Sequence, residues 1–217
     1  MAPFITFEGI EGSGKTTQIR FLAKHLQQQG IEVLRTREPG GCPIADQIRG
    51  ILLNPANAAM IPQTELLLYA AARAQHIEEI VQPALQSGRM VLCDRFTDAT
   101  LAYQGAGRGL DPALIKRLNL LTAGGCHPDL TLLLDLPVEI GISRATHREE
   151  AQQDSSEGRF EREQLEFHQR IRRAYLSMAA AEPQRIRVID AEQTPQQIAQ
   201  QVAAIIDPFL PADSEAL

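Results

Sequence analysis

Residues 9–16 of the 217-residue chain read Gly-Ile-Glu-Gly-Ser-Gly-Lys-Thr, which matches the phosphate-binding pattern G-x-x-x-x-G-K-[ST]. The apolar run Pro3–Glu8 before this loop is typical of a strand, and Lys15–Gln29 after it has helical periodicity and ends at Gly30. In such a loop the backbone N–H groups surround phosphate oxygens, and the positive end of the following helix faces the anion. The pattern therefore predicts a strand, a nucleotide-phosphate loop and a helix in direct succession.

The loop also predicts individual roles. Lys15 is expected to reach the β- and γ-phosphates and Thr16 to ligate Mg²⁺, while Asp94, at the end of the apolar run Met90–Cys93, is the expected second metal contact. An acid is unfavourable beside phosphates, so we expect Glu11 to have another task, such as accepting a hydrogen bond from a sugar hydroxyl. The residues expected to contact ATP are Gly9, Ile10, Glu11, Gly12, Ser13, Gly14, Lys15, Thr16 and Thr17.

Strand-like and helix-like segments alternate along the chain, which favours an α/β fold with a parallel sheet covered by helices on both faces. The predicted strands are Pro3–Glu8, Ile31–Arg35, Met90–Asp94, Leu130–Leu136 and Arg185–Asp190. The predicted helices are Lys15–Gln29, Pro43–Leu53, Thr64–Gln86 (with Thr64 as a candidate cap), Asp111–Leu121, Pro137–Glu150, Arg159–Ala181 and Pro195–Ile206. We expect one domain over residues 1–210 and a C-terminal tail over 211–217.

Composition excludes several classes of protein. The formal net charge of −6 disfavours a nucleic-acid partner, and no apolar run is long enough to span a membrane. The N-terminus shows no secretory signal, and the three cysteines lie far apart without zinc or disulfide spacing, so we expect a cytoplasmic protein. No lysine follows an asparagine, which disfavours the guanine-reading motif of a GTPase. Two alternatives remain, a small-molecule kinase and a P-loop ATPase. If the protein is a kinase, its acceptor could be one of several nucleotides or nucleosides.

Further motifs indicate which family of phosphate-binding proteins the chain resembles. Thr36–Gly41 reads Thr-Arg-Glu-Pro-Gly-Gly, Leu66–Gln75 reads Leu-Leu-Leu-Tyr-Ala-Ala-Ala-Arg-Ala-Gln, and Ala102–Gly105 reads Ala-Tyr-Gln-Gly. With Asp94-Arg95-Phe96 and the phosphate loop, these motifs resemble the bacterial thymidylate kinase (dTMP kinase) family of nucleoside monophosphate kinases. The resemblance covers nearly the whole chain. It implies a single-domain P-loop kinase fold with a five-stranded parallel sheet and a helical lid, a homodimer, and the reaction ATP + dTMP → ADP + dTDP with Mg²⁺, for dTTP synthesis.

The resemblance also implies substrate contacts. Arg95 and Arg49 correspond to the arginines that hold the acceptor phosphate, Tyr69 to the aromatic residue that stacks on thymine, and Arg73 and Thr100 to the residues that bind the base edge. Tyr103 and Gln104 are expected near the deoxyribose and Glu11 near its 3′-hydroxyl, and Arg37, Glu38 and Pro39 complete the expected substrate site. Independently, Tyr69 and Arg73 lie four positions apart, so on a helix they would share a face.

The lid is expected at about residues 144–163. The phosphate loop has no basic residue before Lys15, which resembles the class of the family that supplies a catalytic arginine from the lid. Arg159 is the first candidate for this arginine and Arg148 the second. Gly158 and Cys42 depart from the residues usual at these positions. The acceptor phosphate is already anionic, so we expect catalysis by Lys15, Arg95, Arg159 and Asp94-bound Mg²⁺ through positioning and charge stabilisation.

Overall fold

A parallel sheet of five strands forms the centre of the computed structural model, which describes residues 2–152, 159–160 and 163–210, without the side chains of residues 148–152. The strands are β1 (Phe4–Glu8), β2 (Val33–Arg37), β3 (Met90–Asp94), β4 (Leu130–Asp135) and β5 (Ile186–Asp190). Their order across the sheet is β2-β3-β1-β4-β5, and every neighbouring pair is parallel. This arrangement confirms the predicted fold class.

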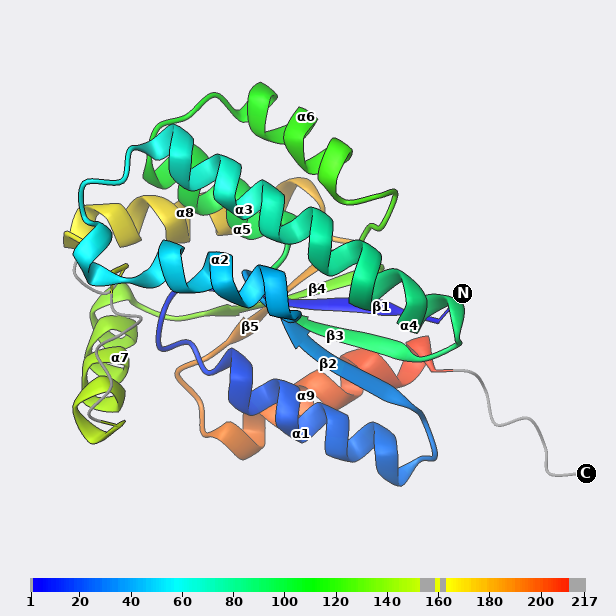
Figure 1. The fold of residues 1–217 in the computed structure, drawn as a ribbon. Helices are drawn as coiled ribbons and strands as arrows, with labels where there is room; N and C mark the ends of the chain where they lie inside the picture. Colours follow the sequence, from blue (N-terminus) through cyan, green and yellow to red (C-terminus); the bar gives the residue numbers. More distant parts are fainter. Residues whose placement is uncertain (1, 153–158, 161–162, 211–217) are drawn as a thin grey trace, which may run out of the picture.

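Helices cover both faces of the sheet (Figure 1). On one face lie α1 (Lys15–Gln28) and α9 (Pro195–Ile206). The other face carries α3 (Pro62–His76), η2 (Ile77–Val81), α4 (Gln82–Gln86), α5 (Thr97–Thr100), η3 (Leu101–Gly107) and α8 (Leu165–Ala181), with α2 (Pro43–Leu53) and α6 (Pro112–Thr122) packed against α3. The helix α7 (Val138–Gln152) and the short turns η1 (Pro55–Asn57) and η4 (Asp207–Phe209) complete the described elements.

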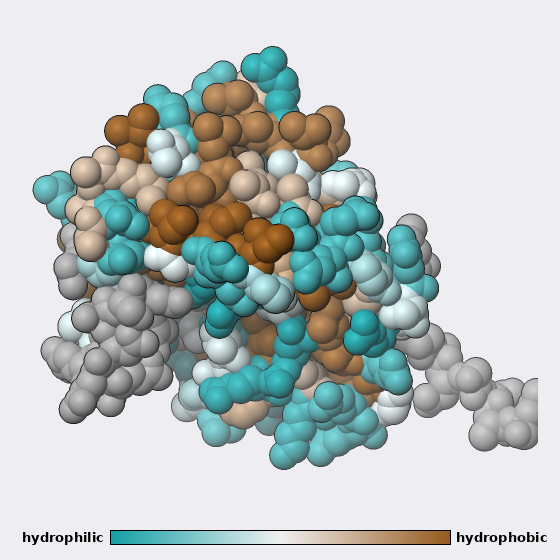
Figure 2. Space-filling model, viewed as in Figure 1, coloured by the Kyte–Doolittle hydropathy of each residue, from teal (hydrophilic) through white to brown (hydrophobic). Residues whose placement is uncertain are grey.

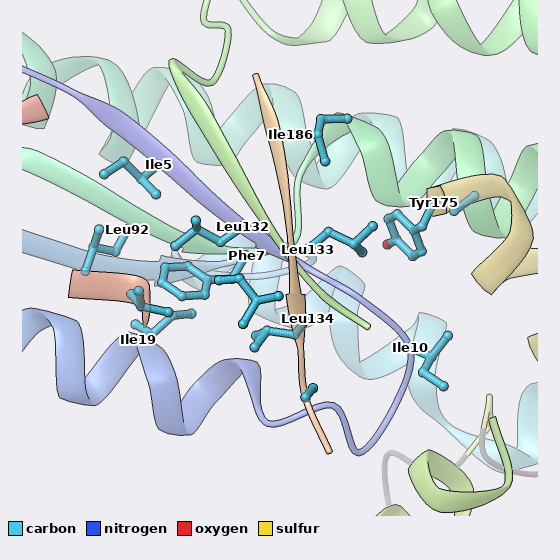
Figure 3. Packing of buried hydrophobic residues seen from close by; sticks show 14 of the residues in the cluster. Ile5, Phe7, Ile10, Ile19, Leu92, Leu132, Leu133, Leu134, Tyr175 and Ile186 are labelled. Carbon is cyan, nitrogen blue, oxygen red and sulfur yellow. The ribbon is translucent and has the colours of Figure 1, made fainter. Parts of the chain in front are cut away.

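The core has two apolar layers because successive strand side chains point to opposite faces of the sheet. Phe7, Leu92 and Leu134 face Ile19 of α1 on one side, whereas Tyr175 of α8 approaches Leu133 from the other (Figure 3). On that second face, Phe4, Val91 and Cys93 of the sheet pack with Ile77, Val81 and Phe96. Burial on both faces explains why β3 and β4 read as nearly continuous apolar runs in the sequence.

Several predicted boundaries were wrong. The second strand runs over Val33–Arg37, because its polar end pairs with the last residues of β3 up to Arg37 opposite Asp94. Thr64 does not cap α3, which begins at Pro62 after Ile61, since proline favours the first helical position.

Arg159, Phe160, Glu163 and Gln164 were also wrongly predicted as helix. Arg159 and Phe160 lie in a turn, and α8 begins at Leu165. The tail at 211–217 and part of the expected lid, 153–158 and 161–162, lie outside the described residues. Among the residues that are described, no helix has the length and apolarity to cross a membrane.

Candidate active site

The phosphate loop connects the end of β1 to the start of α1, as the sequence predicts. Gly9, Gly12 and Gly14 adopt positive φ angles of 138°, 70° and 91°, a region that side-chain-bearing residues rarely enter. A Cβ atom at Gly12 would also collide with the carbonyl oxygen of Gly141 at the start of α7. Glycine is therefore required at this position both for the turn and for its close packing against α7.

Lys15 is folded back over its own loop. Its Nζ donates hydrogen bonds to the carbonyl oxygens of Gly9 (3.1 Å) and Ile10 (2.8 Å) and to Oγ of Ser13 (3.1 Å). Burial lowers the pKa of Lys15 to about 8, with a further contribution from the positive charge of Arg95. At pH 7 the ammonium group is still mostly protonated, so the loop holds a buried positive charge at its centre.

Thr16 and Asp94 meet although they are far apart in the sequence, because β3 and β1 are neighbouring parallel strands that end at the same edge of the sheet. Oγ1 of Thr16 donates a hydrogen bond of 2.9 Å to Oδ2 of Asp94. A hydroxyl and a carboxylate are hard oxygen ligands that suit Mg²⁺. Within the described residues no group of three or more His, Cys, Asp or Glu residues could hold a metal by itself.

Arg95 connects the phosphate loop to the rest of the site. Its φ angle is +70°, and its Nη1 and Nη2 donate to the carbonyl oxygen of Gly9 (3.0 Å) and to Oε1 of Glu11 (3.1 Å). The guanidinium lies 4.6 Å from the centre of the Tyr103 ring, and the Tyr103 hydroxyl donates a 2.7 Å hydrogen bond to the same Oε1. Glu11, Arg95 and Tyr103 thus form one compact group.

The charge of Glu11 is stabilised by its surroundings. Burial by itself raises the pKa of this carboxyl, but the neighbouring His168, Arg95 and Lys15 outweigh that effect and hold the pKa well below its usual range. Nδ1 of His168 lies 3.3 Å from Oε2 of Glu11, without the alignment of a hydrogen bond. Glu11 is therefore an anion throughout the neutral pH range and counters the positive charges around it.

A cavity of about 670 Å³ opens in front of this group. Lys15, Thr16 and Asp94 lie at its phosphate-loop side, and aromatic residues, including Phe160, contribute to its wall. The cavity brings together most of the substrate and catalytic residues predicted from the sequence: Glu11, Lys15, Thr16, Arg37, Glu38, Pro39, Arg49, Tyr69, Asp94, Arg95, Tyr103 and Gln104. Its volume is in the range of pockets that enclose small-molecule ligands.

Arg73 and Thr100 lie behind the wall of this cavity and not on its surface. Arg73, which is 2% exposed, donates from Nε to Oε2 of Glu38 (2.8 Å) and from Nη2 to Oγ1 of Thr100 (2.9 Å). Its Nη1 donates to Oδ1 of Asn119 (2.7 Å). His76 occupies the other oxygen of Glu38, with Nδ1 3.1 Å from Oε1. In this conformation these hydrogen bonds hold the Glu38 segment against α3, the helix that carries Arg73 and His76.

The two lid candidates are placed differently. Arg159 is buried, and its guanidinium donates to the carbonyl oxygen of Leu52 and, at 2.6 Å, to Oε2 of Glu65. It does not line the cavity, whereas its neighbour Phe160 does. Arg148 belongs to α7, but its side chain and the residue Gly158 lie outside the described part of the chain.

Glu65, which binds the cavity-lining residue Gln104, was not predicted from the sequence. Its buried carboxylate accepts hydrogen bonds from Gln104 (2.8 Å), from Arg108 (3.2 and 3.1 Å) and from Arg159. Burial raises its pKa, but these donors outweigh that effect and lower it. The spacing of Glu65, Tyr69 and Arg73, four residues apart in turn, places them along one face of α3, and this was the signal available in the sequence.

Glu8, the last residue of β1, is a second missed residue. Its fully buried carboxyl group accepts hydrogen bonds from the backbone N–H of Phe96 (2.7 Å) and from the hydroxyl of Tyr175 (2.6 Å). Burial, followed by the negative charge of Asp98, raises the pKa of Glu8 to about 7. A titratable group therefore connects the sheet to α8 directly behind the phosphate loop.

The phosphate loop lies at the carboxyl edge of a parallel sheet, and Arg95 joins it to a cationic cavity of nucleotide size. These features define a P-loop kinase of the type that phosphorylates nucleotides. Comparison with known proteins narrows this class. The family model for thymidylate kinase matches residues 7–202. The chain belongs to the thymidylate kinase family: it is an ATP-dependent kinase, and its reaction is the phosphorylation of dTMP to dTDP.

Individual relatives agree with this assignment along almost the full chain. The thymidylate kinase of Geobacter sulfurreducens is 58% identical over 206 residues, which are 95% of this chain and 97% of the relative. The thymidylate kinase of Syntrophotalea carbinolica is 60% identical over 194 residues, 89% of this chain and 90% of the relative. A crystal structure of thymidylate kinase from Ehrlichia chaffeensis superimposes with a TM-score of 0.76 at 33% identity and covers 95% of this chain and 98% of that one.

Proposed function

We propose that the cavity holds the two substrates end to end, with ATP on the phosphate loop and the phosphate of dTMP against Arg95. The observation that carries this proposal is the position of Arg95, which hydrogen-bonds the loop at Gly9 while lining the same cavity as Lys15. Arg49, whose Nη1 donates to the carbonyl oxygen of Pro39 (2.9 Å), lines this cavity as well and is proposed as the second arginine for the acceptor phosphate.

The nucleoside of dTMP is proposed to lie between Tyr69 and Tyr103. Tyr69 provides an aromatic surface for the thymine ring, and Glu11 accepts a hydrogen bond from the 3′-hydroxyl of the sugar. Tyr103 and Gln104, which line the cavity beside them, would crowd a 2′-hydroxyl and favour the deoxyribose. Arg73 and Thr100 are proposed to bind the base edge, which requires a small rearrangement because both are now buried.

Transfer of the phosphoryl group between these positions requires no general base, because the acceptor phosphate is an anion near neutral pH. Lys15 and Arg95 stabilise negative charge on the transferring group and keep donor and acceptor in line. Thr16 and Asp94 are proposed to hold Mg²⁺, which when bound supplies positive charge to the phosphate oxygens. Closure of the lid over the cavity would exclude water and thereby favour transfer to dTMP over hydrolysis.

The experiment that tests this function measures ADP release in a coupled assay with dTMP, dUMP, dCMP or no acceptor. We expect turnover with dTMP and almost none without an acceptor. Release of ADP at the same rate in the absence of any nucleotide acceptor would indicate an ATPase, and a clear preference for another acceptor would indicate a different nucleotide kinase.

A lid arginine that reaches the transferring phosphate is also part of the proposal. Arg159 is the first candidate, and since its guanidinium is now bound to Glu65, it would act only after that ion pair opens. Arg148 on α7 is the second candidate.

We further propose that the chain forms a homodimer through α2, α3 and α6. Figure 2 shows apolar side chains gathered over these helices. Leu120 and Leu121 of α6 are 67% and 77% exposed, and Ile44 and Ile51 of α2, Ile61 and Leu67 at and within α3, and Leu114 of α6 are exposed as well. A contiguous apolar surface of this kind is typical of an interface between subunits. Light scattering after gel filtration should give twice the mass of one chain, and Leu121→Glu should shift the protein toward the monomer.

We place the protein in the cytoplasm on the state of its cysteines. Cys42, Cys93 and Cys126 are all free thiols, and Cys42 and Cys93 are buried. Free thiols are usual in the reducing environment of the cytoplasm. Fractionation of cells followed by detection of the protein would test this location.

A further inference from the structure

His168 of α8 is a buried histidine for which the proposed function provides no task. Its side chain is 1% exposed, and neither ring nitrogen has a hydrogen-bond partner among the described residues. The same is true of Oε2 of Glu11, which lies 3.3 Å from Nδ1 of His168. Buried polar atoms without partners are rare in folded proteins, and two that face each other call for a functional explanation.

The two oxygens of Glu11 are used differently. Oε1 accepts hydrogen bonds from Arg95 and Tyr103, and both of these residues line the cavity. Oε2 faces His168, which does not line the cavity. The polar contact of His168 with the residues that line the cavity therefore runs through Glu11.

The geometry also selects the tautomer of His168. A hydrogen on Nδ1 is on the edge of the ring nearer to a carboxylate oxygen and is favourable, whereas a hydrogen on Nε2 would be a buried donor without a partner. The separation of 3.3 Å is long for a hydrogen bond, but such contacts in unliganded active sites commonly shorten when substrate binds. A small rotation of the Glu11 carboxylate toward α8 would complete the bond.

We propose that His168 is a positioning residue for the acceptor nucleotide: Nδ1–H of His168 holds the Glu11 carboxylate so that its other oxygen orients Arg95 and Tyr103 toward dTMP. This inference rests on the proposed roles of Glu11 and Arg95 in dTMP binding. Without His168, Glu11 is free to turn, and Arg95 and Tyr103 lose a fixed acceptor.

The test combines kinetics with variants of matched size. His168→Phe keeps a ring of similar volume and removes both nitrogens, whereas His168→Asn keeps a donor close to the position of Nδ1. We expect His168→Phe to raise KM for dTMP about tenfold, as for the loss of one hydrogen bond to a charged group, with KM for ATP and the melting temperature nearly unchanged. His168→Asn should recover most of the wild-type KM.

A double-mutant cycle with Glu11→Gln distinguishes this inference from the proposed function. Glu11→Gln should itself raise KM for dTMP, and adding His168→Phe to it should have little further effect. If Glu11→Gln leaves KM for dTMP unchanged, the proposed role of Glu11 fails. If Glu11→Gln acts as expected but His168→Phe alone leaves KM for dTMP at the wild-type value, or has its full effect in the Glu11→Gln background, the inference about His168 is overturned and the proposed function stands.

Nitrogen-15 NMR of the wild-type imidazole tests the inference without any variant. We expect the proton on Nδ1, and we expect the Nδ1 signal to move when dTMP is added. A neutral ring with its proton on Nε2, unchanged by dTMP, would overturn the proposal even if the His168 variants failed to fold.

Discussion

Arg159 donates a 2.6 Å hydrogen bond from Nη2 to Oε2 of Glu65, 94 positions earlier in the chain. The bond ties the turn before α8 to the first turn of α3, and Arg108 and Gln104 of the adjoining η3 region bind the same carboxylate. Arg159 is therefore held in place by the buried carboxylate of Glu65. Experiments can separate a catalytic role of Arg159 from the anchoring role of Glu65.

Arg159→Ala is expected to lower kcat by about 10³-fold or more while KM for ATP changes little, because an arginine finger contacts the phosphate mainly in the transition state. Steady-state kinetics with dTMP and ATP measures both quantities. Arg159→Lys should restore little activity, since lysine lacks the planar fork. Near-normal activity of Arg159→Ala with a crippled Arg148→Ala would assign the finger to Arg148 and leave Arg159 as an anchor.

Glu65→Gln is the matched control for that experiment. It removes the anchor but keeps the Arg159 cation, so kcat should fall far less than in Arg159→Ala. The melting temperature should fall by about 5–10 °C, because two guanidinium groups lose their buried carboxylate partner. Calorimetry measures the melting temperature and steady-state kinetics measures kcat for both variants. A loss of kcat as large as that of Arg159→Ala would show that Glu65 itself is needed for turnover.

Lys15→Ala should reduce turnover by several orders of magnitude with the fold intact. The Lys15 ammonium is the buried positive charge at the centre of the loop, and no other lysine or arginine lies within residues 9–16 to replace it. Circular dichroism checks the fold and the coupled assay checks kcat. A folded Lys15→Ala variant with full activity would disprove the assignment of the phosphate loop.

The choice of acceptor should follow the chemistry of the base. We expect dTMP to be preferred to dUMP modestly, by about 1–3 kcal/mol for one methyl contact. dCMP should be rejected more strongly, because its exchanged donor and acceptor groups would leave buried polar groups unpaired at the base edge. The ratio of kcat/KM for the three nucleotides is the measurement, and equal values for dTMP and dCMP would contradict the proposed base site.

The stability of the fold should depend on pH through Glu8. Because burial raises the pKa of Glu8 from 4.5 to about 7, its neutral form is favoured in the folded state. The stability contributed by Glu8 is fully present below pH 4.5 and is lost as the pH rises through 7, by about 3 kcal/mol in total. Urea unfolding from pH 4 to pH 8 should show this loss in the wild type relative to Glu8→Gln. Parallel curves for the two proteins would contradict it.

Local sequence patterns were sufficient to predict the central sheet of the protein and the position of its phosphate loop. The phosphate loop, the alternation of strands and helices and the apolar runs of β3 and β4 are properties of neighbouring residues, so they predicted the parallel sheet, the loop at its edge and the meeting of Thr16 with Asp94. The functional residues drawn from the resemblance to the family mostly line one cavity, since the motifs that carry them follow the ends of β1, β2 and β3.

Glycine spacing and apolar periodicity act over a few residues, so they specify from the sequence alone which residues are available for phosphate chemistry and in which order the elements follow. The packing of the helices, which no local pattern specifies, places Arg73 behind the cavity wall, pairs Arg159 with Glu65 and brings His168 next to Glu11. The contacts of Arg73 with Glu38, of Arg159 with Glu65 and of His168 with Glu11 all join residues that are at least 35 positions apart in the chain. Their partners are chosen by burial, which forces charged groups to pair wherever the packing of the helices brings them together.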